Sequence, residues 1–74
     1  MLSHTVLVTF NAPEHFGKTT LEAAFAKLLN EHGIEVHMSF DPQREAKMAM
    51  PMEELLKAFK DKNLGVMVME SNAT

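Results

Sequence analysis

The sequence contains no cysteine, no tryptophan and no tyrosine. Without cysteine the chain can form neither a disulfide nor a thiolate metal site, which excludes the disulfide-stapled secreted miniproteins and favours a reducing compartment. No apolar run approaches the roughly 18 residues that a membrane-spanning helix needs, and the first residues lack the basic region of a secretion signal. We therefore expect a cytoplasmic protein without a membrane partner.

Positive charge is also scarce. Seven Lys and Arg stand against ten Asp and Glu, which gives a formal net charge of −3. Because no basic face is available to neutralise a phosphate backbone, we expect no nucleic-acid partner. The 74 residues can form one domain, 1–74, and a core of that size buries only about 60% of the surface of the unfolded chain. Such a chain usually needs a further source of stability, so we expect a homo-oligomer or a protein partner.

Three segments have the alternating pattern of a β-strand: residues 5–10, 34–40 and 64–69. In the second segment apolar residues alternate strictly with polar residues, among them Glu35 and His37. That pattern predicts a strand with one buried and one wet face, which is typical of an antiparallel sheet rather than of a parallel sheet covered on both sides.

Two further segments have helical spacing of their apolar residues, 20–32 and 51–63. Gly33 provides a helix stop after the first, and Pro51 a helix start for the second. Residues 41–44 form a turn signal, and Met48 and Met50 alternate with polar or small residues in a short candidate return strand at 47–50.

The resulting order predicts an α+β fold, a two-layer α/β sandwich with the ferredoxin-like order β-α-β-β-α-β and an antiparallel sheet. A minimal parallel βαβαβ unit is the alternative, which applies if residues 47–50 form no strand.

The sandwich would leave one sheet face open, with an interface formed by Leu7, His37, Met67 and Met69. An exposed apolar patch of this kind usually marks a contact site. The leading hypothesis is therefore a small non-enzymatic interaction or regulatory protein that dimerises or binds a partner through this face. No residue pattern indicates a catalytic group or a metal site, and no cofactor is expected under this hypothesis.

Residues 12–19 carry a second signal, since Ala-Pro-Glu-His-Phe-Gly-Lys-Thr fits the relaxed phosphate-loop pattern between a strand and a helix. With Gly17, Lys18 and Thr19, and with Asp-Pro-Gln at 41–43, the chain resembles the phosphate-loop nucleotide hydrolases, in particular the ParA-type partition ATPases. The resemblance implies that Lys18 contacts phosphate, that Thr19 contacts magnesium, and that Asp41 lies near the metal or the attacking water. The alternative hypothesis is therefore binding of phosphate or of a magnesium nucleotide.

The loop also departs from that family. Pro13 removes an amide donor, and Glu14 places a negative charge where phosphate would bind. A structural interpretation explains the same residues, because Thr19 and Glu22 have the spacing of a capping box at the start of a helix. In that interpretation Lys18 is a solvated surface charge.

Overall fold

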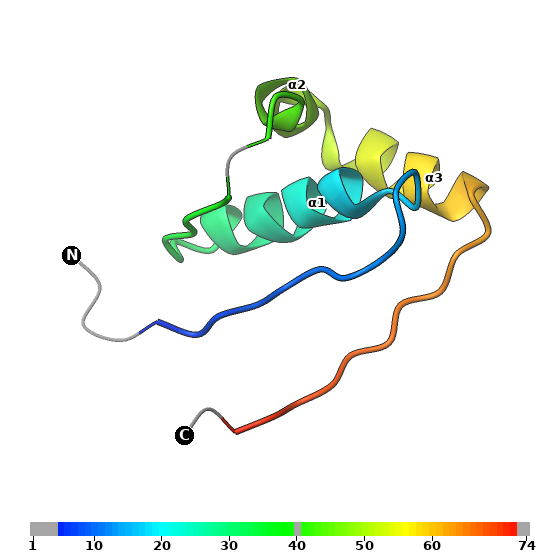
Figure 1. Cartoon of the computed structure of the whole chain (residues 1–74). Coiled ribbons are helices and arrows are strands. Elements are labelled where there is room, and N and C mark those ends of the chain that lie inside the picture. The colour runs from blue at the N-terminus through cyan, green and yellow to red at the C-terminus, as the bar shows by residue number, and fades with distance from the viewer. Residues whose placement is uncertain (1–4, 40, 73–74) are drawn as a thin grey trace.

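The computed structural model describes residues 5–39 and 41–72. These residues form three helices, α1 (Lys18–Glu31), α2 (Arg44–Ala49) and α3 (Met52–Asp61), and no β-strand (Figure 1). None of these helices is long and apolar enough to cross a membrane.

The expected ferredoxin-like sandwich is wrong, because the described residues contain no sheet. Residues 5–10, 34–39 and 64–69 are drawn as open stretches of chain in Figure 1, and no backbone hydrogen bond joins any two of them. The alternation in the sequence specifies which side chains share a face, but a strand also needs a second backbone at hydrogen-bonding distance. The parallel βαβαβ alternative lacks its sheet for the same reason. Phe40, the last residue of the second expected strand, lies outside the described residues.

The expected return strand at 47–50 is also wrong, since residues 47–49 belong to α2. The segment from Arg44 to Ala49 consists of residues with favourable helix propensity and has the acid Glu45 in its first turn. Asp41 starts the segment with a turn, in which its main-chain carbonyl accepts from the Arg44 amide at 3.0 Å. The helix propensity of these residues therefore outweighs the short alternation of Met48 and Met50 that predicted a strand.

The two longer helices lie close to their expected positions. Helix α1 ends at Glu31, and Gly33 follows with φ +79°, while the Ile34 amide donates to the Leu29 carbonyl at 3.0 Å. This is the left-handed helix stop that glycine accommodates without steric cost. Helix α3 follows Pro51, whose carbonyl accepts from the Leu55 amide.

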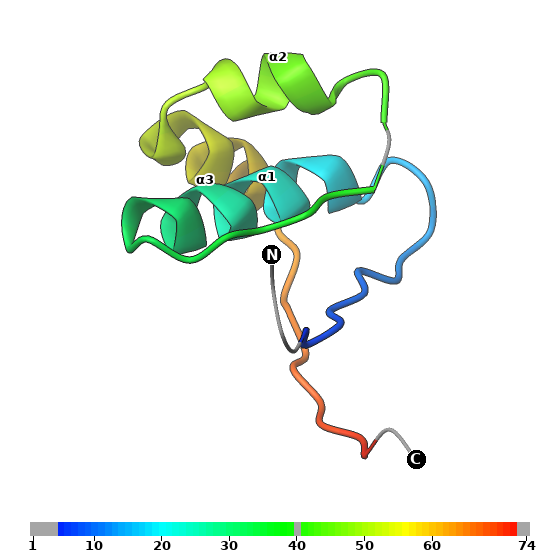
Figure 2. The same cartoon turned by 90° about the vertical axis from the view of Figure 1, so that its left-hand side faces the viewer.

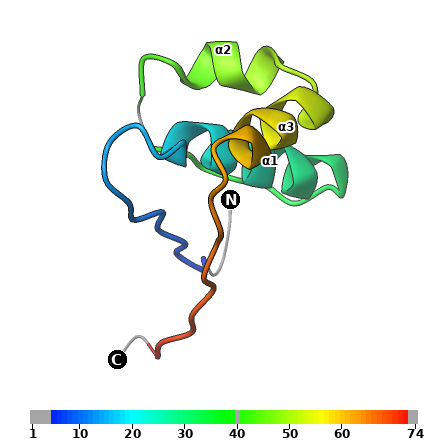
Figure 3. The ribbon, with the colours of Figure 1, turned by 90° about the vertical axis from the view of Figure 1, so that its right-hand side faces the viewer.

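The core is small and lies where α1 meets α2 and α3. Its buried apolar residues are Ala23, Ala24 and Leu55, while Ala26 is buried on α1 outside this cluster. Three alternate methionines pack around this cluster: Met48, Met50 and Met52. The alanines give α1 a flat face that lets the other helices approach closely. Figures 2 and 3 show α2 and α3 on one side of α1, while residues 5–10 (the N-terminal segment) and 64–69 (the C-terminal segment) extend from the other side.

Candidate functional site

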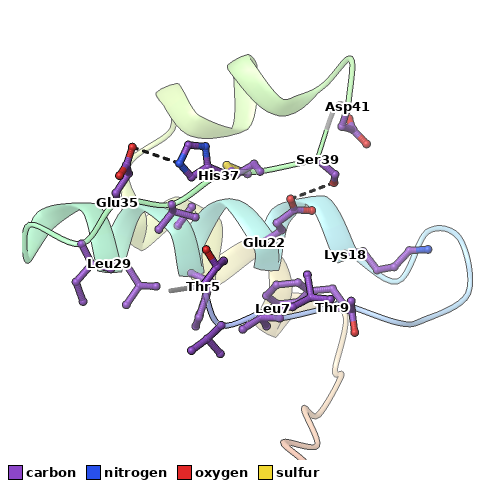
Figure 4. A pocket seen from close by; sticks show the side chains of 18 of the residues that line it. Thr5, Leu7, Thr9, Lys18, Glu22, Leu29, Glu35, His37, Ser39 and Asp41 are labelled. Carbon is purple, nitrogen blue, oxygen red and sulfur yellow. Dashed lines mark hydrogen bonds and ion pairs between the residues drawn. The ribbon is translucent and has the colours of Figure 1, made fainter. Parts of the chain in front are cut away.

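The described residues form two hollows on either side of the start of α1. The first, called the groove below, has a volume of about 810 Å³ and runs between residues 5–10 and residues 34–39 (Figure 4). Its floor is the apolar face of α1, formed by Phe25, Ala26 and Leu29. The groove therefore has an apolar floor, and charged residues such as Lys18, Glu22 and Asp41 also line it.

Contacts with α1 hold both walls in place. The Phe10 ring meets the Phe25 ring edge to face, with centroids 5.8 Å apart and an interplanar angle of 68°. This geometry is favourable for two aromatic rings. On the other wall the Ser39 hydroxyl donates to Glu22 Oε1 at 3.5 Å, and Arg44 donates to the Ser39 carbonyl at 3.4 Å. The walls are thus attached to the helix rather than to each other.

Two of the four residues expected at the interface, Leu7 and His37, line this groove. Leu7 is 84% exposed, and His37 lies 3.2 Å from Glu35 at the exposed rim. Met67 and Met69 do not line it. They belong to the C-terminal segment, which extends away from the helices in Figure 1, with Met67 83% exposed. The structure therefore does not bring the expected patch together in one chain.

The second hollow, called the loop hollow below, has a volume of about 560 Å³. Gly17, Lys18 and Thr19 all line it, together with Asp41. The Thr19 hydroxyl donates to Asp41 Oδ2 at 3.3 Å, although the two residues are 22 positions apart. Lys18, Thr19 and Asp41 also line the groove, so the two hollows meet there.

The capping box expected at Thr19 and Glu22 is wrong. Helix α1 begins at Lys18, its N-cap is Gly17, and no side chain caps it. Gly17 has φ +80°, and a Cβ added there would lie 3.3 Å from Phe59 Cδ1. Glycine therefore suits the backbone conformation at this position, and a Cβ would also crowd the Phe59 ring of α3. With Thr19 inside the helix, its hydroxyl is directed to Asp41 instead of to a backbone amide.

Sequence reasoning missed two cations of the loop hollow, Lys47 and Lys62. Lys47 comes from α2, and Lys62 follows α3 and donates through Nζ to the His15 carbonyl at 3.0 Å. Neither lies in a motif, and only the packing of α2 and α3 on α1 brings them to the loop. Glu14 lines the same hollow and adds negative charge.

Both carboxylate oxygens of Asp41 accept a hydrogen bond. Its Oδ1 accepts from the Gln43 amide at 2.7 Å, and its Oδ2 accepts from Thr19. A carboxylate, a hydroxyl and nearby ammonium groups are groups that can contact a magnesium-bound phosphate. The described residues contain no cluster of three or more His, Cys, Asp or Glu side chains that could hold a metal ion by themselves.

A comparison of the chain with models of known protein families, with curated proteins and with solved structures finds no match.

Proposed function

We propose that this protein acts by non-catalytic contact, and that its partner is a second copy of the same chain. The observation that carries the proposal is the exposure of the apolar C-terminal segment, in which Met67 is 83% and Val68 is 88% exposed. In the N-terminal segment Val6 and Leu7 are exposed to the same degree. Apolar side chains gathered on a surface in this way mark an interaction site.

The small core explains why a partner would stabilise the protein. Among residues 5–39 and 41–72 only four apolar residues are buried, and three of them are alanines. Burying a large apolar side chain contributes about 1.5–3 kcal/mol. Covering the exposed valines and methionines would therefore add stabilisation comparable with that of the core itself.

A second copy is favoured because both exposed segments lack charge. Residues 5–10 and 64–69 contain no Asp, Glu, Lys or Arg, so these segments add no charge repulsion of their own when two copies meet. A symmetric dimer also uses each segment twice, which doubles the apolar area covered. We propose the cytoplasm as the location of this assembly, because a chain without cysteine forms no disulfide that an oxidising compartment would maintain.

Sedimentation equilibrium tests the proposal. The protein is expected to form dimers at micromolar concentration, and Met67→Asp is expected to shift it to monomer because the new carboxylate would lose its hydration at the interface. Leu56→Asp is the matched control, since Leu56 lies half exposed on α3, outside both segments. A strict monomer at high micromolar concentration would contradict the proposal.

We propose binding of a magnesium nucleotide as a second candidate function, and the observation that favours it is the contact between Thr19 and Asp41 in the loop hollow. Three lysines line the same hollow: Lys18, Lys47 and Lys62. Ammonium groups would contact phosphate oxygens, and the hydroxyl with the carboxylate would contact the metal or its water. A phosphate at the start of α1 would also meet the positive end of the helix dipole.

Thermal unfolding in the presence of ATP or GTP with Mg²⁺ tests this second candidate. A ligand at a hundred times its dissociation constant stabilises the folded state by about 2.7 kcal/mol. Lys18→Ala is expected to abolish the rise in melting temperature. The control is Lys57→Ala, because Lys57 lies on α3 and pairs with Asp61 at 2.8 Å, outside the hollow. Unchanged melting at millimolar nucleotide would exclude this function.

A further inference from the structure

The groove has two walls that are not paired with each other. Within residues 5–39 and 41–72, no backbone hydrogen bond connects the wall at 5–10 with the wall at 34–39. The two walls nevertheless line one continuous hollow over the same face of α1 (Figure 4). The Ile34 amide and the Met38 and Ser39 carbonyls have partners within the chain. A strand placed between the two walls could pair with backbone groups that these contacts do not use.

We propose that this groove receives residues 64–69 of a second copy, so that two chains exchange their C-terminal segments. This inference rests on the proposed self-association and identifies the surfaces that meet. Each chain would supply one groove and one inserted segment. The two contacts would be identical, as in a closed symmetric dimer.

The inserted segment matches the groove floor in chemistry. The segment is uncharged and carries exposed Val66 and Val68, while the groove floor is formed by Phe25, Ala26 and Leu29. In an inserted strand, alternate side chains would face this floor and the others would face solvent or the partner.

The exit from α3 favours insertion into a second copy rather than into the same chain. After α3 the Lys62 amide donates to the Phe59 carbonyl at 3.2 Å and the Asn63 amide donates to the Lys60 carbonyl at 2.9 Å. Asn63 adopts φ +57°, and the Lys62 ammonium is held by the His15 carbonyl. This turn directs the following residues away from the helices (Figures 1 and 3). Exchange leaves the turn as it is, whereas insertion into the same chain would have to rearrange it.

Cysteine crosslinking tests the inference cleanly, because the chain has no cysteine of its own. One full-length variant carries Leu7→Cys in the groove wall, and a second carries Met67→Cys in the C-terminal segment. Neighbouring strands bring Cα atoms to about 4.5–5.5 Å, within the range for a disulfide. Thr9→Cys replaces Leu7→Cys in a parallel experiment, so that a mismatch in strand register does not hide the contact.

When the two variants are mixed and oxidised, disulfides between the different chains are expected to exceed those of the control by about tenfold, because paired segments react at a high effective concentration. The control mixes Met67→Cys with Leu56→Cys on the exposed part of α3. Circular dichroism of each variant establishes that its helices are retained. Crosslinks at the control level in both parallel experiments would overturn the inference.

The remaining outcomes separate this inference from the proposed self-association. If the protein is a dimer but only Met67→Cys chains crosslink with each other, self-association stands and groove insertion is wrong. A chain carrying both Leu7→Cys and Met67→Cys tests insertion into its own groove. If it forms its disulfide within a monomer, insertion is intramolecular and exchange is wrong. A monomer without any excess crosslinks overturns both proposals.

Discussion

At the scale of single residues, Leu55 shows how little core this protein has. It is the largest fully buried side chain among the described residues, and it packs against Ala23 and Ala24. Its neighbour Leu56 is half exposed on the same helix. The two leucines therefore form a matched pair that differs in burial alone.

We expect Leu55→Ala to lower the free energy of unfolding by about 2–5 kcal/mol, because the removed atoms lose their contacts and leave a cavity. Leu56→Ala is expected to change it by no more than about 0.5 kcal/mol, as for most surface positions. Urea unfolding followed by circular dichroism measures both. Equal effects of the two substitutions would show that α3 does not dock on α1 through Leu55.

The contact between Thr19 and Asp41 depends on the fold. The sequence places Lys18 and Thr19 next to each other and Asp41 far away, and the resemblance to phosphate-loop proteins implies that they share a site. The structure places the Thr19 hydroxyl 3.3 Å from Asp41. The capping box, a purely local interpretation, is wrong because the helix starts at Lys18. A shift of two residues in the helix start changes the role of the threonine.

At the scale of elements, α2 depends on a contact from another helix. It has six residues, none of them buried, and isolated helices of this length are unstable in water. The Lys27 ammonium on α1 donates to the Met48 carbonyl at 3.1 Å and to the Met50 carbonyl. A cation at the C-terminal end of α2 also interacts favourably with the helix dipole.

Replacing this contact by Lys27→Met is expected to loosen α2 while α1 keeps its helical structure. Methionine keeps the apolar part of the side chain and removes the donor. Hydrogen exchange at the amides of residues 44–50 is expected to rise by about tenfold, equivalent to about 1.4 kcal/mol of local stability. Lys57→Met on exposed α3 is the control. Unchanged exchange in residues 44–50 would show that methionine packing alone holds α2.

The ion pair of Lys57 and Asp61 on α3 makes a small pH-dependent contribution to stability. The hydrogen bond from Lys57 to Asp61, followed by their charge attraction, raises the pKa of Lys57 above its ordinary value of 10.5. A raised lysine pKa means that its contribution to stability is present below the ordinary pKa and lost as the pH rises through the raised value. Both side chains are largely exposed, so this contribution is small and constant near neutral pH.

At the scale of the whole molecule, large apolar side chains in residues 5–10 and 64–69 stay exposed because the three helices do not cover them. If two copies cover it, the folded state is coupled to association and the melting temperature depends on protein concentration. We expect the melting temperature to rise with concentration for the protein and to stay constant for Met67→Asp.

Salt distinguishes this apolar contact from a charged one. Because residues 5–10 and 64–69 are uncharged, sodium chloride is expected to weaken the dimer by less than about twofold, in contrast to the screening of exposed charges. Sedimentation at low and high salt measures the effect. A dissociation constant that rises steeply with salt would show that charged groups outside the two segments form the interface.

The sequence by itself determined the two longer helices, because their apolar spacing and their glycine or proline boundaries are local signals that act within a few residues. It also identified three segments with the alternation of strands. Tertiary structure decided the rest. Whether 5–10, 34–39 and 64–69 pair depends on the distance between backbones far apart in the chain. In the structure the groove over α1 lies between the two walls, and the turn after α3 directs the third segment away. The meeting of Thr19 with Asp41, and the arrival of Lys47 and Lys62 at the same hollow, likewise follow from how α2 and α3 pack on α1.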